Sequence, residues 1–83
     1  MSLLADLFRK IESIAKEQGA HRVTKVQLEL GVMAHISPEH LREHFERAAL
    51  GTVADNAELV IELNEDPNNP QAQSILLKSV DVQ

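Results

Sequence analysis

Apolar residues from Leu3 to Ala15 recur every three or four positions, and charged residues fill most of the positions between them. This spacing is typical of an amphipathic helix that buries one stripe. Gly19 follows the last apolar residue and is suited to a helix C-terminus, because glycine adopts the left-handed conformation at little cost. The pattern therefore predicts a first helix that ends shortly before Gly19.

The apolar period changes to two in three later segments. Residues 24–30 and 57–63 alternate between apolar and polar side chains, as do strands with one buried face. Residues 75–82 predict a third strand, with Lys78 as an exception to its alternation. The buried face of this strand is expected to carry Leu76, Val80 and Val82.

A second helix is predicted between the first two strands. Ser37 can cap the free amide groups, Pro38 suits the first helical position, and Glu39 complements the positive end of the helix dipole. Gly51 is expected to terminate it. One apolar face would consist of Leu41, Phe45, Ala48 and Ala49.

The resulting order is α-β-α-β-β over one domain, residues 1–83, which predicts a two-layer α+β fold. A helical connection between the first two strands favours a parallel, right-handed crossover. The loop at residues 64–73 favours antiparallel pairing of the second and third strands. Two helices would then cover one face of a three-stranded mixed sheet. The other face could meet water and would carry Lys25, Gln27, Glu29, Glu58 and Glu62.

The composition and net charge of the chain argue against several classes of function. The chain has 83 residues, a formal net charge of −5, no cysteine, and only two aromatic residues, Phe8 and Phe45. The acidic charge argues against nucleic acid, which is bound mainly through lysine and arginine. Without cysteine the chain can form neither a disulfide nor a thiolate zinc site.

No apolar run reaches the length of a membrane span and no signal peptide is recognised, so the cytoplasm is the expected location. Dimerisation would be a natural way for so small a domain to bury more surface.

Among four histidines, only His40 and His44 have a spacing that suits a shared ligand, four residues apart on one helix. Two imidazoles at this spacing can hold one divalent ion. The sequence shows no third ligand, and the charge of Arg42 would repel a cation nearby. We therefore interpret the pair primarily as two boundary residues on a half-exposed helix, with a metal clip as the alternative. His21 and His35 are interpreted as turn and loop residues.

No catalytic constellation is evident. Glu58 and Glu62 share one face of the second predicted strand and could pair as acid and base, although charged residues on a solvent-facing sheet are far commoner. The glycines are isolated at element ends rather than gathered in a phosphate-binding loop. We expect a protein that is not an enzyme.

The arrangement of several short segments resembles the HypA/HybF family. The resemblance covers nearly the whole chain through the order and spacing of residues 19–26, 28–31, 37–42, 45–46, 51–54, 57–59 and 77–82. It implies a nickel-handling domain that delivers metal to hydrogenase, or in some organisms to urease, together with a GTPase of the HypB type. It also implies two helices on a three-stranded sheet.

Two departures from the family pattern bear on metal binding. The family inserts a zinc ribbon with two paired-cysteine motifs where this chain has only loop 64–73, so zinc is not expected. Family members begin Met-His-Glu, a variable residue and Ser-Leu. Here Ser2 and Leu3 match the Ser-Leu and Met1 falls on the variable position, so the family's histidine ligand would precede Met1. Either the start is truncated or misassigned, with nickel held through the missing residues, or the protein has lost the site. We favour the first interpretation, because the helix behind these residues is intact. No family metal ligand is carried over to this sequence.

Two functions follow from the resemblance. The first is an accessory protein for metallocentre assembly, a metallochaperone that docks on a maturation GTPase and on the hydrogenase or urease apoprotein. The alternative is a metal-free interaction module or scaffold derived from the same family, which the absence of the ribbon favours.

Overall fold

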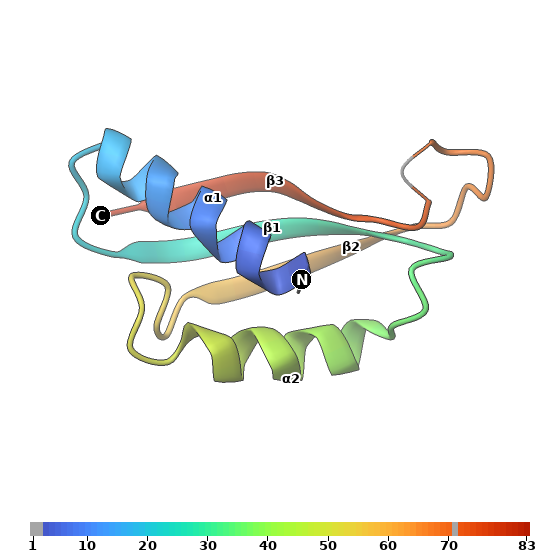
Figure 1. Ribbon diagram of the computed structural model, residues 1–83, viewed down its shortest axis with the longest axis horizontal. Coiled ribbons are helices and arrows are strands. Elements are labelled where there is room, and N and C mark those ends of the chain that lie inside the picture. The colour runs from blue at the N-terminus through green and yellow to red at the C-terminus, as the bar shows by residue number, and fades with distance from the viewer. Residues whose placement is uncertain (1–2, 71) are drawn as a thin grey trace.

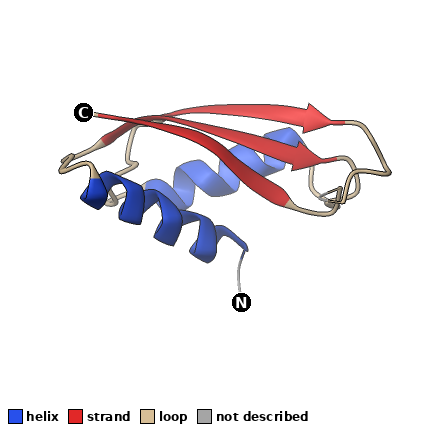
Figure 2. Cartoon of the chain, turned by 90° about the horizontal axis from the view of Figure 1, so that it is seen from above, coloured by secondary structure: helices blue, strands red, loops and turns tan. Residues whose placement is uncertain are grey.

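The computed structural model describes residues 3–70 and 72–83, and its elements follow the predicted order. They are α1 (Leu3–Glu17), β1 (Val23–Gly31), α2 (Pro38–Ala49), β2 (Glu58–Asn64) and β3 (Ile75–Val82). Figure 1 shows the three strands side by side, and Figure 2 shows that both helices lie on the same side of the sheet. The predicted two-layer α+β architecture is confirmed.

The helix ends are formed by the residues that the sequence indicated. Gly19 has φ +64°, its N–H donates to the carbonyl of Lys16, and the N–H of Ala20 donates to the carbonyl of Ala15. This pair of hydrogen bonds is the Schellman arrangement that satisfies the last free carbonyls of a helix. Gly51 has φ +78° immediately after the C-cap of α2. Both positions require the left-handed conformation, which glycine adopts without steric penalty.

Strand order differs from the expected one. The sheet runs β2-β1-β3, with β1 parallel to β2 and antiparallel to β3. The parallel pairing was predicted correctly, but the predicted pairing of β2 with β3 is wrong. The reason lies in the helices, because α2 packs on β2 and α1 packs on β3, so that β1 takes the centre between them. A loop at residues 65–74 is long enough to pass one strand, since neighbouring strands are only about 5 Å apart.

Strand β3 contains an irregularity that changes which of its side chains reach the core. Gln27 pairs with Ser79 but Leu28 pairs with Leu77, so Lys78 is an extra residue in the ladder. A bulge of this kind shifts the alternation of the strand by one position. As a result Leu77 packs against the core, together with Ile75, Val80 and Val82. The prediction that Leu76 belongs to this face is wrong, because the bulge places Leu76 on the opposite face from Val80 and Val82, where it pairs with Glu29.

The core lies between the helices and the sheet and is aliphatic apart from two rings. Phe8 of α1 and Phe45 of α2 stack with their centroids 4.9 Å apart, which joins the two helices. Beneath them Val26, Leu28 and Leu30 of β1 are fully buried. They belong to the same core cluster as Leu41, Phe45 and Ala49, the buried residues of α2.

The sheet face opposite the helices is polar, as predicted. Lys25 Nζ lies 3.9 Å from Glu58 Oε2, and Lys78 Nζ lies 3.7 Å from Glu29 Oε1. Ion pairs between neighbouring strands suit a surface that meets water. Within the described residues, no helix is long and apolar enough to cross a membrane.

Candidate metal site

The two histidines of α2 come together on its exposed side. Ser37, in extended conformation, accepts a hydrogen bond from the N–H of His40 through its hydroxyl, and Pro38 occupies the first helical turn. His40 and His44 then lie one turn apart, and their Nε2 atoms are 2.8 Å from each other. Their ring centroids are 4.5 Å apart and the rings are tilted by 55°. The spacing predicted from sequence thus produces direct contact between the two imidazoles.

The nearby charged side chains are engaged elsewhere. Arg42 donates from its guanidinium to the carbonyl oxygen of Leu59 in β2, at 2.8 Å. Residues two apart on a helix do not share a face, so this cation is directed away from the histidine pair. Arg47 forms an ion pair with Glu43 at 3.3 Å. The expectation that Arg42 repels an ion at this position loses its force, because its charge points toward β2.

The other two histidines stay apart from this pair. His21 donates its backbone N–H to the carbonyl of Gln83, beside the start of β1. His35 lies in the β1–α2 connection with φ +60°. Across residues 3–70 and 72–83, no group of three histidine, aspartate or glutamate side chains gathers in a way that could hold a metal ion. Any ion bound at His40 and His44 would therefore have two protein ligands.

The paired glutamates of β2 are too far apart for shared acid–base chemistry. Glu58 and Glu62 point to the same face, but four residues along a strand correspond to about 13 Å. Carboxylates that cooperate in glycoside hydrolysis, for comparison, lie about 5–10 Å apart. Glu58 is also engaged with Lys25. The geometry therefore argues against a catalytic dyad at this face.

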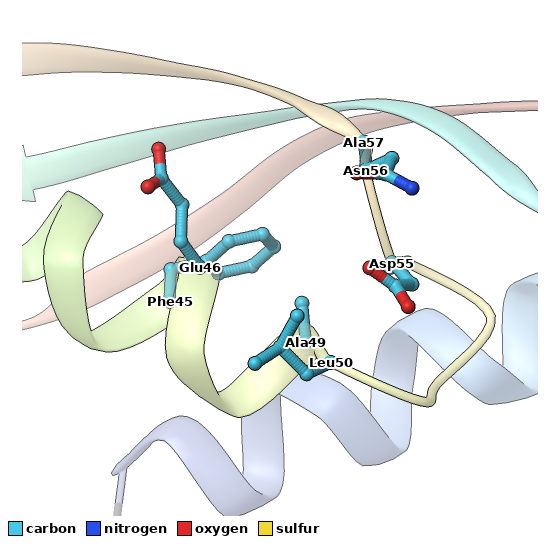
Figure 3. Close-up of a pocket in the computed structure, with 8 residues that line it drawn as sticks. Phe45, Glu46, Ala49, Leu50, Asp55, Asn56 and Ala57 are labelled. Carbon is cyan, nitrogen blue, oxygen red and sulfur yellow. The ribbon is translucent and has the colours of Figure 1, made fainter.

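A hollow opens between the C-terminal half of α2 and the turn before β2, with a volume of about 370 Å³ (Figure 3). Phe45 and Ala49 form part of its wall, and the Asp55 carboxylate accepts a hydrogen bond from the N–H of Gly51 at 3.1 Å. This bond stabilises the turn. The lining supplies carboxylates and one amide but no nucleophile with a partnered base, so the hollow offers no evident catalysis.

Three features of the surface were not apparent from the sequence. The hydrogen bond from Arg42 to β2 joins positions 17 residues apart and carries no local signal. The ion pair of Lys78 depends on the bulge in β3. The contact between His40 and His44 could be anticipated from their spacing, but not its distance. Met1 and Ser2, where the start of the chain was compared with the family pattern, lie outside the described residues.

Comparison with known proteins gives a consistent result. A sequence profile described as "Hydrogenase/urease nickel incorporation, metallochaperone, hypA" matches residues 1–68. The hydrogenase maturation factor HypA of Chlorobium limicola is 42% identical over 62 residues, which cover 75% of this chain and 53% of that protein. The hydrogenase maturation factor HypA of Methanosarcina acetivorans is 38% identical over 61 residues, which cover 74% of this chain and 46% of that protein. The chain therefore spans about half the length of the curated relatives it matches.

A solved structure matches the architecture as well. The solution structure of the Ni metallochaperone HypA from Helicobacter pylori superimposes with a TM-score of 0.79 at 17% identity. The match covers 96% of this chain and 93% of that one. At this level of identity the likeness concerns the fold, two helices on one face of a mixed sheet.

Proposed function

Because the chain belongs to the HypA family of hydrogenase and urease nickel-incorporation proteins, we propose that it is an accessory protein for metallocentre assembly. In this role it receives nickel as cargo and delivers it to the apoprotein of a hydrogenase or a urease. The observation that carries the proposal is the family match over residues 1–68. The fold shared with a nickel metallochaperone agrees with it.

The proposed setting is the cytoplasm, with a GTPase of the HypB type as a docking partner and a homodimer as a natural assembly. The acidic chain, with a net charge of −5, is poorly suited to nucleic acid. A thiolate zinc site has no place in the proposal, because the chain has no cysteine and a loop at residues 65–74 connects β2 to β3. We also propose that the protein is not an enzyme, which the separation of Glu58 from Glu62 supports.

Deleting the gene in its native host tests the role. We expect hydrogenase or urease activity to fall in the deletion strain and to recover partly when excess nickel is added, because unassisted loading is limited by metal supply. A plasmid that carries the deleted gene should restore activity at ordinary nickel concentrations. Unchanged activity of both enzymes in the deletion strain would refute the proposal.

The second candidate is a metal-free interaction module, favoured by the direct connection of β2 to β3 where the family carries its zinc ribbon. It predicts that the purified chain captures a maturation GTPase or a hydrogenase large subunit equally well with and without a chelator. A delivery protein should instead capture its partner in a way that depends on nickel. Capture measured with and without the chelator therefore separates the two candidates.

A further inference from the structure

We infer that His40 and His44 form a bidentate clip for one divalent first-row transition-metal ion, held through both imidazole Nε2 atoms. The site lies on the exposed face of α2 and uses residues of this chain alone. It does not depend on the proposed function, because it concerns binding of an ion and not the identity of a client enzyme.

The distance between the two nitrogen atoms suits chelation. Imidazole nitrogens bind such ions at about 2.0–2.1 Å, so two ligands in neighbouring positions lie about 3 Å from each other. The Nε2 atoms of His40 and His44 are 2.8 Å apart, within a few tenths of an ångström of this value. In the absence of an ion the same geometry allows an N–H···N hydrogen bond between neutral rings. The two nitrogens are therefore already at the separation that one shared ion requires.

The helix is held in a way that preserves this geometry. The Ser37 hydroxyl accepts from the N–H of His40 at 3.2 Å, which orders the turn that carries the first ring. On the opposite side Leu41 and Phe45 are 0% and 1% exposed, so the rotation of the helix about its axis is fixed by the core. The backbone that carries the two rings is therefore fixed, so that ion binding needs to order only the two side chains, which favours affinity.

The charges around the pair do not exclude a cation. The N-terminal end of a helix dipole opposes positive charge, and His40 lies in the first turn of α2. Glu39 in the same turn carries a negative charge, whereas Glu43 is already paired with Arg47. The guanidinium of Arg42 is bound to the Leu59 carbonyl.

Two protein ligands leave the remaining coordination positions to water. Such a site exchanges its ion readily, unlike a closed site with four ligands. Imidazole donors suit nickel, copper and zinc, and affinity should follow the general order Co²⁺ < Ni²⁺ < Cu²⁺ > Zn²⁺. An ion can be transferred to another set of ligands only if it leaves its site readily and has open coordination positions, and this site would meet both conditions.

The test is calorimetric titration of the full chain with nickel chloride, repeated with copper and zinc. We expect one ion per chain, and a loss of affinity of about a hundredfold in either His40→Gln or His44→Gln, because a single ring loses the chelate advantage. The control His21→Gln/His35→Gln removes the same number of rings elsewhere and should bind as the parent does. Equal binding by His40→Gln/His44→Gln and the parent would overturn the inference.

A second variant tests whether binding depends on the spacing of the two histidines or only on their number. His44→Ala/Ala48→His keeps the composition and net charge but places the second ring eight residues from His40, about 12 Å along the helix. Position 48 is exposed, so the fold should tolerate this exchange, and circular dichroism verifies it. We expect this variant to bind as weakly as His44→Gln. Affinity within about threefold of the parent would contradict a bidentate clip, since spacing would then not matter.

Discussion

Adjacent residues of α2 have opposite environments: Leu41 and Phe45 on the inner face are 0% and 1% exposed, whereas His40 and His44 on the outer face meet solvent. The inner residues contact a core that is filled by Val26, Leu28 and Leu30 of β1. The outer residues contact mainly each other. One helix thus serves two purposes, because a face that packing does not constrain can carry a metal-binding group at little cost in stability.

Phe45→Ala on the inner face should have the largest effect. It removes a buried ring that stacks on Phe8 at 4.9 Å, and large-to-small changes of this kind lower the free energy of unfolding by about 3–5 kcal/mol. Chemical denaturation measures the loss, with the exposed neighbour Glu46→Ala as control, expected within about 0.5 kcal/mol of the parent. Similar values for the two variants would mean that α2 does not pack as described.

Arg42→Met should rank second, because it leaves the Leu59 carbonyl at the outer edge of β2 without its charged donor. We expect a loss of about 1–2 kcal/mol, which is at the lower end for a hydrogen bond to a charged group because the site is partly exposed. Faster amide hydrogen exchange in β2, with β3 unaffected, would show that the lost hydrogen bond to Leu59 causes the loss of stability. Arg42→Lys should recover part of the loss, and its failure to do so would point to packing instead.

Ser37→Ala removes the cap of α2 and should cost about 1 kcal/mol. The same change should weaken metal binding, because the turn that carries His40 becomes less ordered. The matched control is Ser13→Ala, at an exposed position of α1, which should leave the free energy of unfolding and the metal affinity unchanged. If Ser37→Ala lowered stability but not affinity, the geometry of the pair would not depend on the first turn.

His40→Gln/His44→Gln should have the smallest effect on the metal-free protein. Exposed substitutions of this kind usually change the free energy of unfolding by less than about 0.5 kcal/mol. Thermal unfolding with and without nickel should show a stabilisation by metal in the parent that is lost in the variant. A large destabilisation without metal would instead assign these histidines to the fold.

The sequence predicted those parts of the molecule that depend on local periodicity. Helix and strand positions, the glycine ends, the Ser37 cap and the polar sheet face followed from spacing and residue type. The pairing of β3 with β1 was missed, because strand order depends on how two helices share one sheet and not on the length of a loop. Leu76 was assigned to the wrong face, because the exception at Lys78 cannot be identified as a bulge until the partner strand is known.

The candidate site also has one part that the sequence predicted and one part that it did not. The four-residue spacing of His40 and His44 was visible in the sequence and indicated a shared ligand. The direction of Arg42 was not, since its partner Leu59 belongs to another element. The sequence therefore identified the two rings but overestimated the repulsion beside them.

The most direct test of the account is a ¹H–¹⁵N NMR titration of the full chain with zinc chloride, a diamagnetic probe, observing backbone amides and imidazole nitrogens together. The account predicts that the Nε2 resonances of both His40 and His44 shift with one common binding curve. Amide shifts should be confined to the first turns of α2, with those of β1 unmoved. Shifts that concentrate at the first residues of the chain or at the open sheet face, with both imidazoles unchanged, would contradict it.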